Sequence, residues 1–80
     1  MRQVEVAVIG TGWCGGMRAV TLSRSALVDK LHLCEIRPER LEEVRALTNP
    51  ATATTDYQDI LRNPAIEVVY ISTTPEGTHY

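Results

Sequence analysis

The 80-residue sequence lacks long apolar runs and blocks of like charge. No apolar stretch approaches the roughly 18 residues of a membrane-spanning helix. Eight basic and ten acidic residues are spread along the chain, and the net charge is −2. The lack of a basic block argues against nucleic acid as a partner. The start Met-Arg-Gln-Val-Glu-Val carries an acid, which favours a first strand over a signal peptide. We therefore expect a cytoplasmic protein that binds neither nucleic acid nor membrane.

Cysteine and lysine are also scarce. Cys14 and Cys34 are the only cysteines, and they form neither a C-x-x-C pair nor a metal-ligand cluster. We therefore predict no metal site, and two reduced thiols are favoured over a disulfide. Lys30 is the only lysine. We assign no catalytic residue to this chain.

The clearest motif is Gly10-Thr11-Gly12-Trp13-Cys14-Gly15, which directly follows the apolar run 4–9. A strand that leads into G-x-G-x-x-G and a helix is the dinucleotide-binding fingerprint. Gly10 allows the tight turn, Gly12 lets the backbone approach a pyrophosphate, and Gly15 lets helix and strand pack closely. The amides at the helix start then favour a phosphate group.

Apolar runs and breaker residues predict alternating strands and helices. The strands are expected at 2–9, 30–35, 51–55 and 66–72. Helices are expected over 13–23, from Pro38 to Asn49-Pro50, and from the N-cap Asp56 to Asn63-Pro64. Right-handed crossovers put the strands in the order 3-2-1-4. We therefore predict an α/β protein with a partial, Rossmann-type doubly wound parallel sheet.

The same pattern predicts which side of each helix is buried. Trp13, Met17 and Val20 recur at helical spacing and should form the buried stripe of the first helix. Leu41, Val44 and Leu47 should do so in the second. The fourth strand should be left as an exposed apolar edge.

Glu35 stands 20 residues after Gly15, at the end of the second predicted strand. A carboxylate there can accept hydrogen bonds from the adenosine ribose of a dinucleotide, and the alternative is a solvated strand end. It also repels a 2′-phosphate, so NAD is preferred and NADP is the alternative. Arg37 and Arg40 are close enough to pair with that phosphate or to stack on adenine.

The predicted strand order reverses between the first and fourth strands, which opens a crevice beyond their carboxyl ends. Those ends lead into Gly10–Gly15 and into Thr73, Thr74 and Pro75. His79 follows, where it contacts either the nicotinamide side of a cofactor or solvent. His32 lies inside the second strand and is expected to be structural.

On these residues, the chain resembles the N-terminal domain of the glucose–fructose oxidoreductase/inositol 2-dehydrogenase (Gfo/Idh/MocA) oxidoreductases over essentially all 80 residues. The resemblance rests on four segments: Val8–Trp13, Glu35–Arg40, Thr55–Leu61 with Asn63-Pro64, and Val68–Pro75 with His79.

The resemblance implies a role for each candidate residue. Amides of Thr11 to Cys14 would hold the pyrophosphate, Glu35 the ribose, and Arg40 would pack near adenine. Thr73 to Pro75, with His79, would line the nicotinamide side. Family members transfer hydride between the nicotinamide and a hydroxyl-bearing carbon of a sugar, cyclitol or related small molecule.

The chain departs from the family where catalysis should begin. The family's Glu-Lys-Pro segment and its substrate domain are not found in these 80 residues, and Lys30 lies at the start of the second predicted strand, on the wrong side of the fold. We therefore expect the chain to be the N-terminal part of a longer oxidoreductase and to be inactive alone. The full-length protein can form a homo-oligomer. The alternatives are another dehydrogenase, a methyltransferase that uses S-adenosylmethionine, a silent nucleotide-binding or regulatory module, and a non-functional truncated product.

Overall fold

The computed structural model describes residues 3–11 and 13–72, and only the backbone of residues 13 and 14. Strands and helices alternate in the predicted order. They are β1 (Val4–Ile9), α1 (Trp13–Ser23), β2 (Val28–Cys34), α2 (Pro38–Thr48), β3 (Thr52–Thr54), α3 (Tyr57–Leu61) and β4 (Ile66–Ile71). The main difference in boundaries is β2, which starts two residues before the predicted Lys30.

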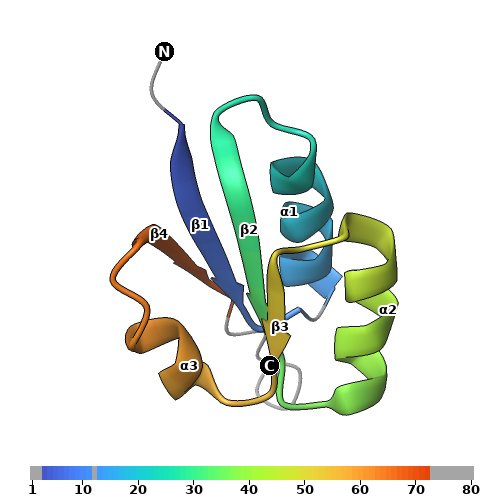
Figure 1. Ribbon diagram of the computed structural model, residues 1–80. Coiled ribbons are helices and arrows are strands. Elements are labelled where there is room, and N and C mark those ends of the chain that lie inside the picture. Colours follow the sequence, from blue (N-terminus) through green and yellow to red (C-terminus); the bar gives the residue numbers. More distant parts are fainter. Residues whose placement is uncertain (1–2, 12, 73–80) are drawn as a thin grey trace, which may run out of the picture.

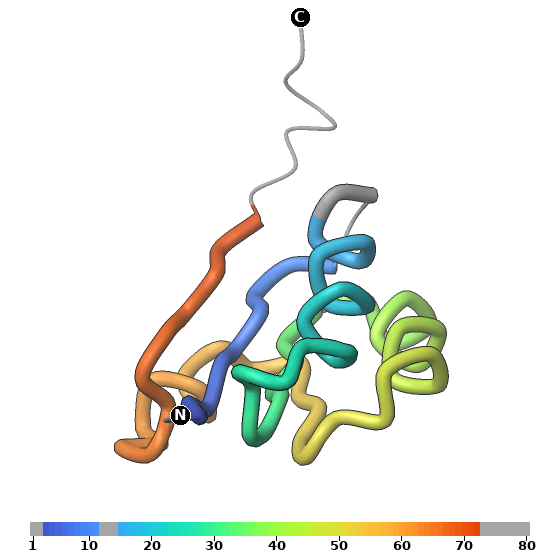
Figure 2. The backbone as a smooth tube through the Cα atoms, turned by 90° about the horizontal axis from the view of Figure 1, so that it is seen from above, coloured from blue at the N-terminus to red at the C-terminus, as the bar shows by residue number. Residues whose placement is uncertain are grey.

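The four strands form one parallel sheet in the order β3-β2-β1-β4. Helices α1 and α2 lie together on one face, and α3 lies on the other (Figure 1). Seen from above, β4 lies at the sheet edge farthest from α2 (Figure 2). The predicted partial, doubly wound Rossmann-type sheet is confirmed.

The central strands supply apolar side chains to both faces of the sheet, because successive residues of a strand point in opposite directions. Val8 and Leu33 pack under α1 and α2, against Ala19 and Val44. On the other face, a second cluster contains Ala7, Cys34 and Ile60 of α3. The sheet is therefore packed from both sides, as in parallel α/β proteins.

The prediction for the buried face of α1 was wrong for Met17, and the side chain of Trp13 lies outside the described residues. Met17 is 61% exposed and Val20 is only half-buried, whereas Gly15 and Ala19 are buried. A Cβ atom on Gly15 would lie 2.0 Å from the carbonyl oxygen of Gly10. The smallest residues of α1 therefore face the sheet, because only they allow the helix to approach this closely.

The buried side of α2 was predicted in part. Val44 is buried and Leu41 half-buried, but Leu47 is 69% exposed. Thr48 takes the expected place of Leu47, and its hydroxyl donates a 2.8 Å hydrogen bond to the carbonyl oxygen of Val44. This internal bond satisfies the hydroxyl and makes a buried threonine acceptable there. Asn49, in a left-handed conformation, ends the helix as predicted.

Among residues 3–11 and 13–72, the edge strand β4 pairs only with β1, and its residues Val68, Val69 and Ile71 are exposed. Tyr70 is half-buried, and the guanidinium of Arg18 lies 5.3 Å from the centre of its ring. The predicted exposed apolar edge is confirmed for this part of the chain. Within residues 3–11 and 13–72, no helix is long and apolar enough to cross a membrane.

The observed face of α1 leads to a stability prediction. Ala19→Leu should lower the free energy of unfolding by about 1–3 kcal/mol, because the extra atoms have no space between helix and sheet. Met17→Ala should change it by about 0.5 kcal/mol or less, since this side chain is largely exposed. Urea denaturation of the two variants measures both values. A loss of about 2 kcal/mol or more in Met17→Ala would show that Met17 is buried after all.

Candidate functional site

The glycine loop begins between the ends of two strands. The N–H of Gly10 donates a 2.8 Å hydrogen bond to the carbonyl oxygen of Cys34 in β2. Gly10 has φ +89°, and a Cβ atom there would lie 2.3 Å from the carbonyl oxygen of Ser72, which follows β4. Glycine is therefore required by both the backbone conformation and the close approach of β4. This agrees with the turn predicted for Gly10.

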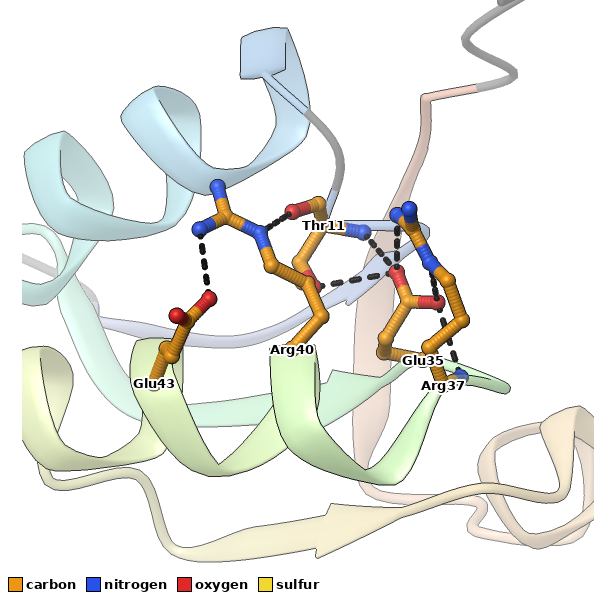
Figure 3. Close-up of polar contacts among 5 residues, drawn as sticks. All are labelled: Thr11, Glu35, Arg37, Arg40 and Glu43. Atoms are coloured by element: carbon orange, nitrogen blue, oxygen red, sulfur yellow. Dashed lines mark hydrogen bonds and ion pairs between the residues drawn. The ribbon is translucent and has the colours of Figure 1, made fainter.

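Thr11 is fully buried, and the segment after β2 binds all of its polar groups (Figure 3). Its N–H and its hydroxyl donate to Oε1 of Glu35, at 2.8 and 3.0 Å. Its carbonyl oxygen accepts a hydrogen bond from Nε of Arg40. The first residue inside the glycine loop is thus held through its N–H, its hydroxyl and its carbonyl oxygen.

Glu35 directly follows β2, and it is only 4% exposed. Besides the two bonds from Thr11, its carboxylate accepts three from Arg37. The N–H and the Nε of Arg37 donate to Oε2, both at 3.0 Å, and Nη2 donates to Oε1 at 3.4 Å. The two neighbours therefore surround the carboxylate with donors.

These contacts determine the charge of Glu35. Burial alone raises the pKa of the carboxyl, but the hydrogen bonds from Arg37 and Thr11 more than offset it and lower the pKa from 4.5 to about 2. Glu35 is therefore ionised at neutral pH although it is buried. A negative charge lies beneath the glycine loop, where a dinucleotide-binding site requires an acceptor.

Arg40 joins the glycine loop to α2. Its Nη1 donates to a carboxylate oxygen of Glu43 at 3.1 Å, in addition to the bond from Nε to Thr11. A Cβ atom on Gly16 would lie 2.5 Å from Nη2 of Arg40. The guanidinium therefore packs against the first turn of α1. Its predicted place near adenine stays a prediction.

Several predicted site residues lie partly or wholly outside the described residues. Trp13 and Cys14 are the first two residues of α1, but only their backbone is described. The wholly undescribed ones are Gly12, Thr73, Thr74, Pro75 and His79. The N–H of Ser72 donates to the carbonyl oxygen of Ile9 at 2.9 Å, so β4 ends beside the start of the glycine loop.

The side chains of three other residues take no part in this site. His32 is buried, with Nδ1 at 2.8 Å from Oγ1 of Thr52 and Nε2 at 2.9 Å from Oε1 of Glu5. It bridges three strands, which fits the structural role predicted for it. Lys30 lies opposite Glu5 in the register of β2 with β1, toward the amino ends of the strands and away from the glycine loop. Cys34 is a free, buried thiol, and burial raises its pKa.

Sequence reasoning missed two parts of the site. The amide of Thr11 was assigned to the pyrophosphate, but this amide and the Thr11 hydroxyl both donate to Glu35. It was also not foreseen that Arg37 binds Glu35 with both its backbone and its side chain. The Thr11–Glu35 contact spans 24 positions, and no local pattern signals it. The spacing of Arg37, two residues after Glu35, was the available signal for the second contact.

A family model described as "Oxidoreductase family, NAD-binding Rossmann fold" (GFO_IDH_MocA) matches residues 4–80. The chain belongs to this Gfo/Idh/MocA family. Both the predicted family and NAD as the cofactor are confirmed by this match. No curated protein matches the chain by sequence.

One similar solved structure is the scyllo-inositol dehydrogenase from Lactobacillus casei, crystallised with bound NAD(H) and scyllo-inositol. It is 18% identical, and the TM-score is 0.77. The match covers 98% of this Gfo/Idh/MocA chain and 23% of that protein. At this identity the likeness establishes the Rossmann fold. The chain thus spans about a quarter of the length of that dehydrogenase.

The low pKa of Glu35 predicts how stability depends on acid. The folded state holds this pKa near 2, below the usual 4.5, so the stabilisation is complete above pH 4.5 and is lost as the pH falls toward 2. The unfolding free energy of the wild type should therefore fall as the pH drops from 4.5 toward 2. In Glu35→Gln this fall should be smaller by about 2–3 kcal/mol, because the amide does not titrate. Chemical denaturation at several pH values measures it.

The matched control is Glu39→Gln, which removes an exposed carboxylate from the first turn of α2. This variant should keep the acid dependence of the wild type. If Glu35→Gln also keeps it, the charge of Glu35 contributes no folding energy in this pH range.

Proposed function

We propose that this chain is the cofactor-binding portion of an NAD(P)-dependent oxidoreductase. The complete enzyme would transfer hydride between the nicotinamide and a hydroxyl-bearing carbon of a sugar, cyclitol or related small molecule. The single observation that carries the proposal is the contact between Glu35 and Thr11. It joins the acid after β2 to the glycine loop after β1, at the end of the sheet where such folds bind nucleotides.

The pyrophosphate would be received by the first turn of α1. The N–H of Thr11 is bound to Glu35, so the amides available for a phosphate begin beyond this residue. Helix α1 starts at Trp13 and has no acidic residue in its first turn. Unpaired amides and the helix dipole favour an anion at such an end. The chain therefore fits a dinucleotide at this position, with Gly12 and Cys14 in the contact as well.

The nicotinamide half of the cofactor would lie across the strand-order reversal between β1 and β4. We propose that Thr73, Thr74, Pro75 and His79 line it. The end of β4 supports this placement, because Ser72 is hydrogen-bonded to Ile9 and packs against Gly10. The bound nicotinamide supplies the hydride chemistry, while these residues position the ring.

The catalytic group would come from a part of the complete protein beyond these 80 residues. The sole lysine, Lys30, lies toward the amino ends of the strands, the end opposite the glycine loop. The neighbouring dehydrogenase is also several times longer than this chain. We therefore propose that this chain forms the N-terminal cofactor-binding part of a two-domain enzyme and is inactive alone.

Calorimetric titration of the full-length protein tests the proposal. We expect NADH to bind and S-adenosylmethionine not to bind, because the site is built for a dinucleotide. We also expect NADH to bind more tightly than NADPH, because the ionised Glu35 repels a 2′-phosphate. Reduction of NAD⁺ with a panel of polyols, followed by the absorbance of the reduced nicotinamide, tests the reaction.

Each outcome separates one alternative. S-adenosylmethionine binding in place of NADH would indicate a methyltransferase. NADH binding with no hydride transfer to any polyol would favour a silent nucleotide-binding module. NADPH affinity equal to or above that for NADH would overturn the preference for NAD.

A further inference from the structure

The hydrogen-bonding capacity of Glu35 is used up within the protein. A carboxylate offers about four lone-pair sites on its two oxygens. Thr11 donates two hydrogen bonds to these oxygens and Arg37 donates three. With only 4% of Glu35 exposed, no acceptor site is left for another donor. A ribose diol can therefore bind Glu35 only if one of these donors leaves.

The guanidinium of Arg37 is the donor that can leave most easily. Thr11 is fully buried and is also held by Arg40. The backbone N–H of Arg37 is fixed at the N-cap of α2, directly before Pro38. The side chain of Arg37, by contrast, is 47% exposed. The ribose hydroxyls would donate to the same carboxylate oxygens, so Glu35 keeps its donors when the exposed guanidinium leaves.

We propose that Arg37 is a specificity-determining residue that competes with the adenosine ribose of NAD for Glu35. The inference rests on the proposed function. When NAD binds, the guanidinium releases Glu35 so that the ribose hydroxyls can donate to it. When NADP binds, the guanidinium pairs with the 2′-phosphate and offsets the charge of Glu35. Arg37 therefore weakens NAD binding, strengthens NADP binding and narrows the preference for NAD.

Arg37→Ala in the full-length protein tests this competition, with dissociation constants for NADH and NADPH from calorimetry. We expect NADH to bind about twofold to fivefold more tightly, because the ion pair between Arg37 and Glu35 no longer has to break. We expect NADPH to bind about tenfold more weakly, because a charged hydrogen bond to its phosphate is lost. The two affinities thus move in opposite directions.

The matched control is Arg45→Ala. Arg45 lies in α2, is 46% exposed, and pairs with Glu42. The variant therefore removes the same charge, at nearly the same exposure, away from Glu35. It should leave the ratio of the two affinities unchanged. Arg37→Gln provides a second variant with a longer side chain, in case Arg37→Ala lowers the yield of folded protein.

Arg37→Ala with weaker or unchanged NADH binding overturns the inference, since Arg37 would then contact NADH or play no part. Unchanged NADPH binding overturns it as well. A wild-type protein that binds neither cofactor overturns the proposed function itself. If the wild type binds NADH but the Arg37 variants behave like Arg45→Ala, the proposed function stands. Only the competition between Arg37 and the ribose for Glu35 is then rejected.

Discussion

The contact between Thr11 and Glu35 is the interaction on which the carboxyl end of the sheet depends. Thr11 has no access to water, so its polar groups need partners within the protein. Glu35 and Arg40 provide them, and the bonds from Arg37 and Thr11 keep the buried carboxylate of Glu35 charged. One network of hydrogen bonds therefore shapes the glycine loop, keeps Glu35 ionised and holds the start of α2. Removing the side chain of Glu35 or Arg40 leaves a buried polar group of Thr11 without its partner, which is costly.

The order of elements was predictable because local signals mark their limits. Pro38 begins α2, Asn49 ends it in a left-handed conformation, and Asp56 caps α3 through its side chain. The buried faces of the helices were not predictable in this way. Hydrophobic periodicity favours the largest apolar residues, such as Met17, but a helix that lies close to a sheet needs its smallest residues at the contact. The distance between helix and sheet is a property of the whole fold.

The candidate site was predictable in its backbone and less so in its side chains. The position of Glu35 followed from its spacing after the glycine loop, and the structure places the two in contact. The ion pair with Arg37 depends on the rotamers of two long side chains, which no sequence pattern records. The hydroxyl of Thr11 depends on a contact between distant positions. The roles assigned to Thr73, Thr74, Pro75 and His79 stay predictions.

The pairing of β1 with β4 has a consequence for how the protein is made. The two partners of β1 leave the ribosome at very different times, because Val8 pairs with Leu33 on one side and with Tyr70 on the other. At a synthesis rate of roughly 5–20 residues per second, the second partner follows the first by about 2–7 seconds. During that interval β1 is paired with β2 on one edge and has no partner strand on the other. The nascent chain thus passes through a stage that is open to chaperones and to misassociation, before the domain that binds the cofactor is closed.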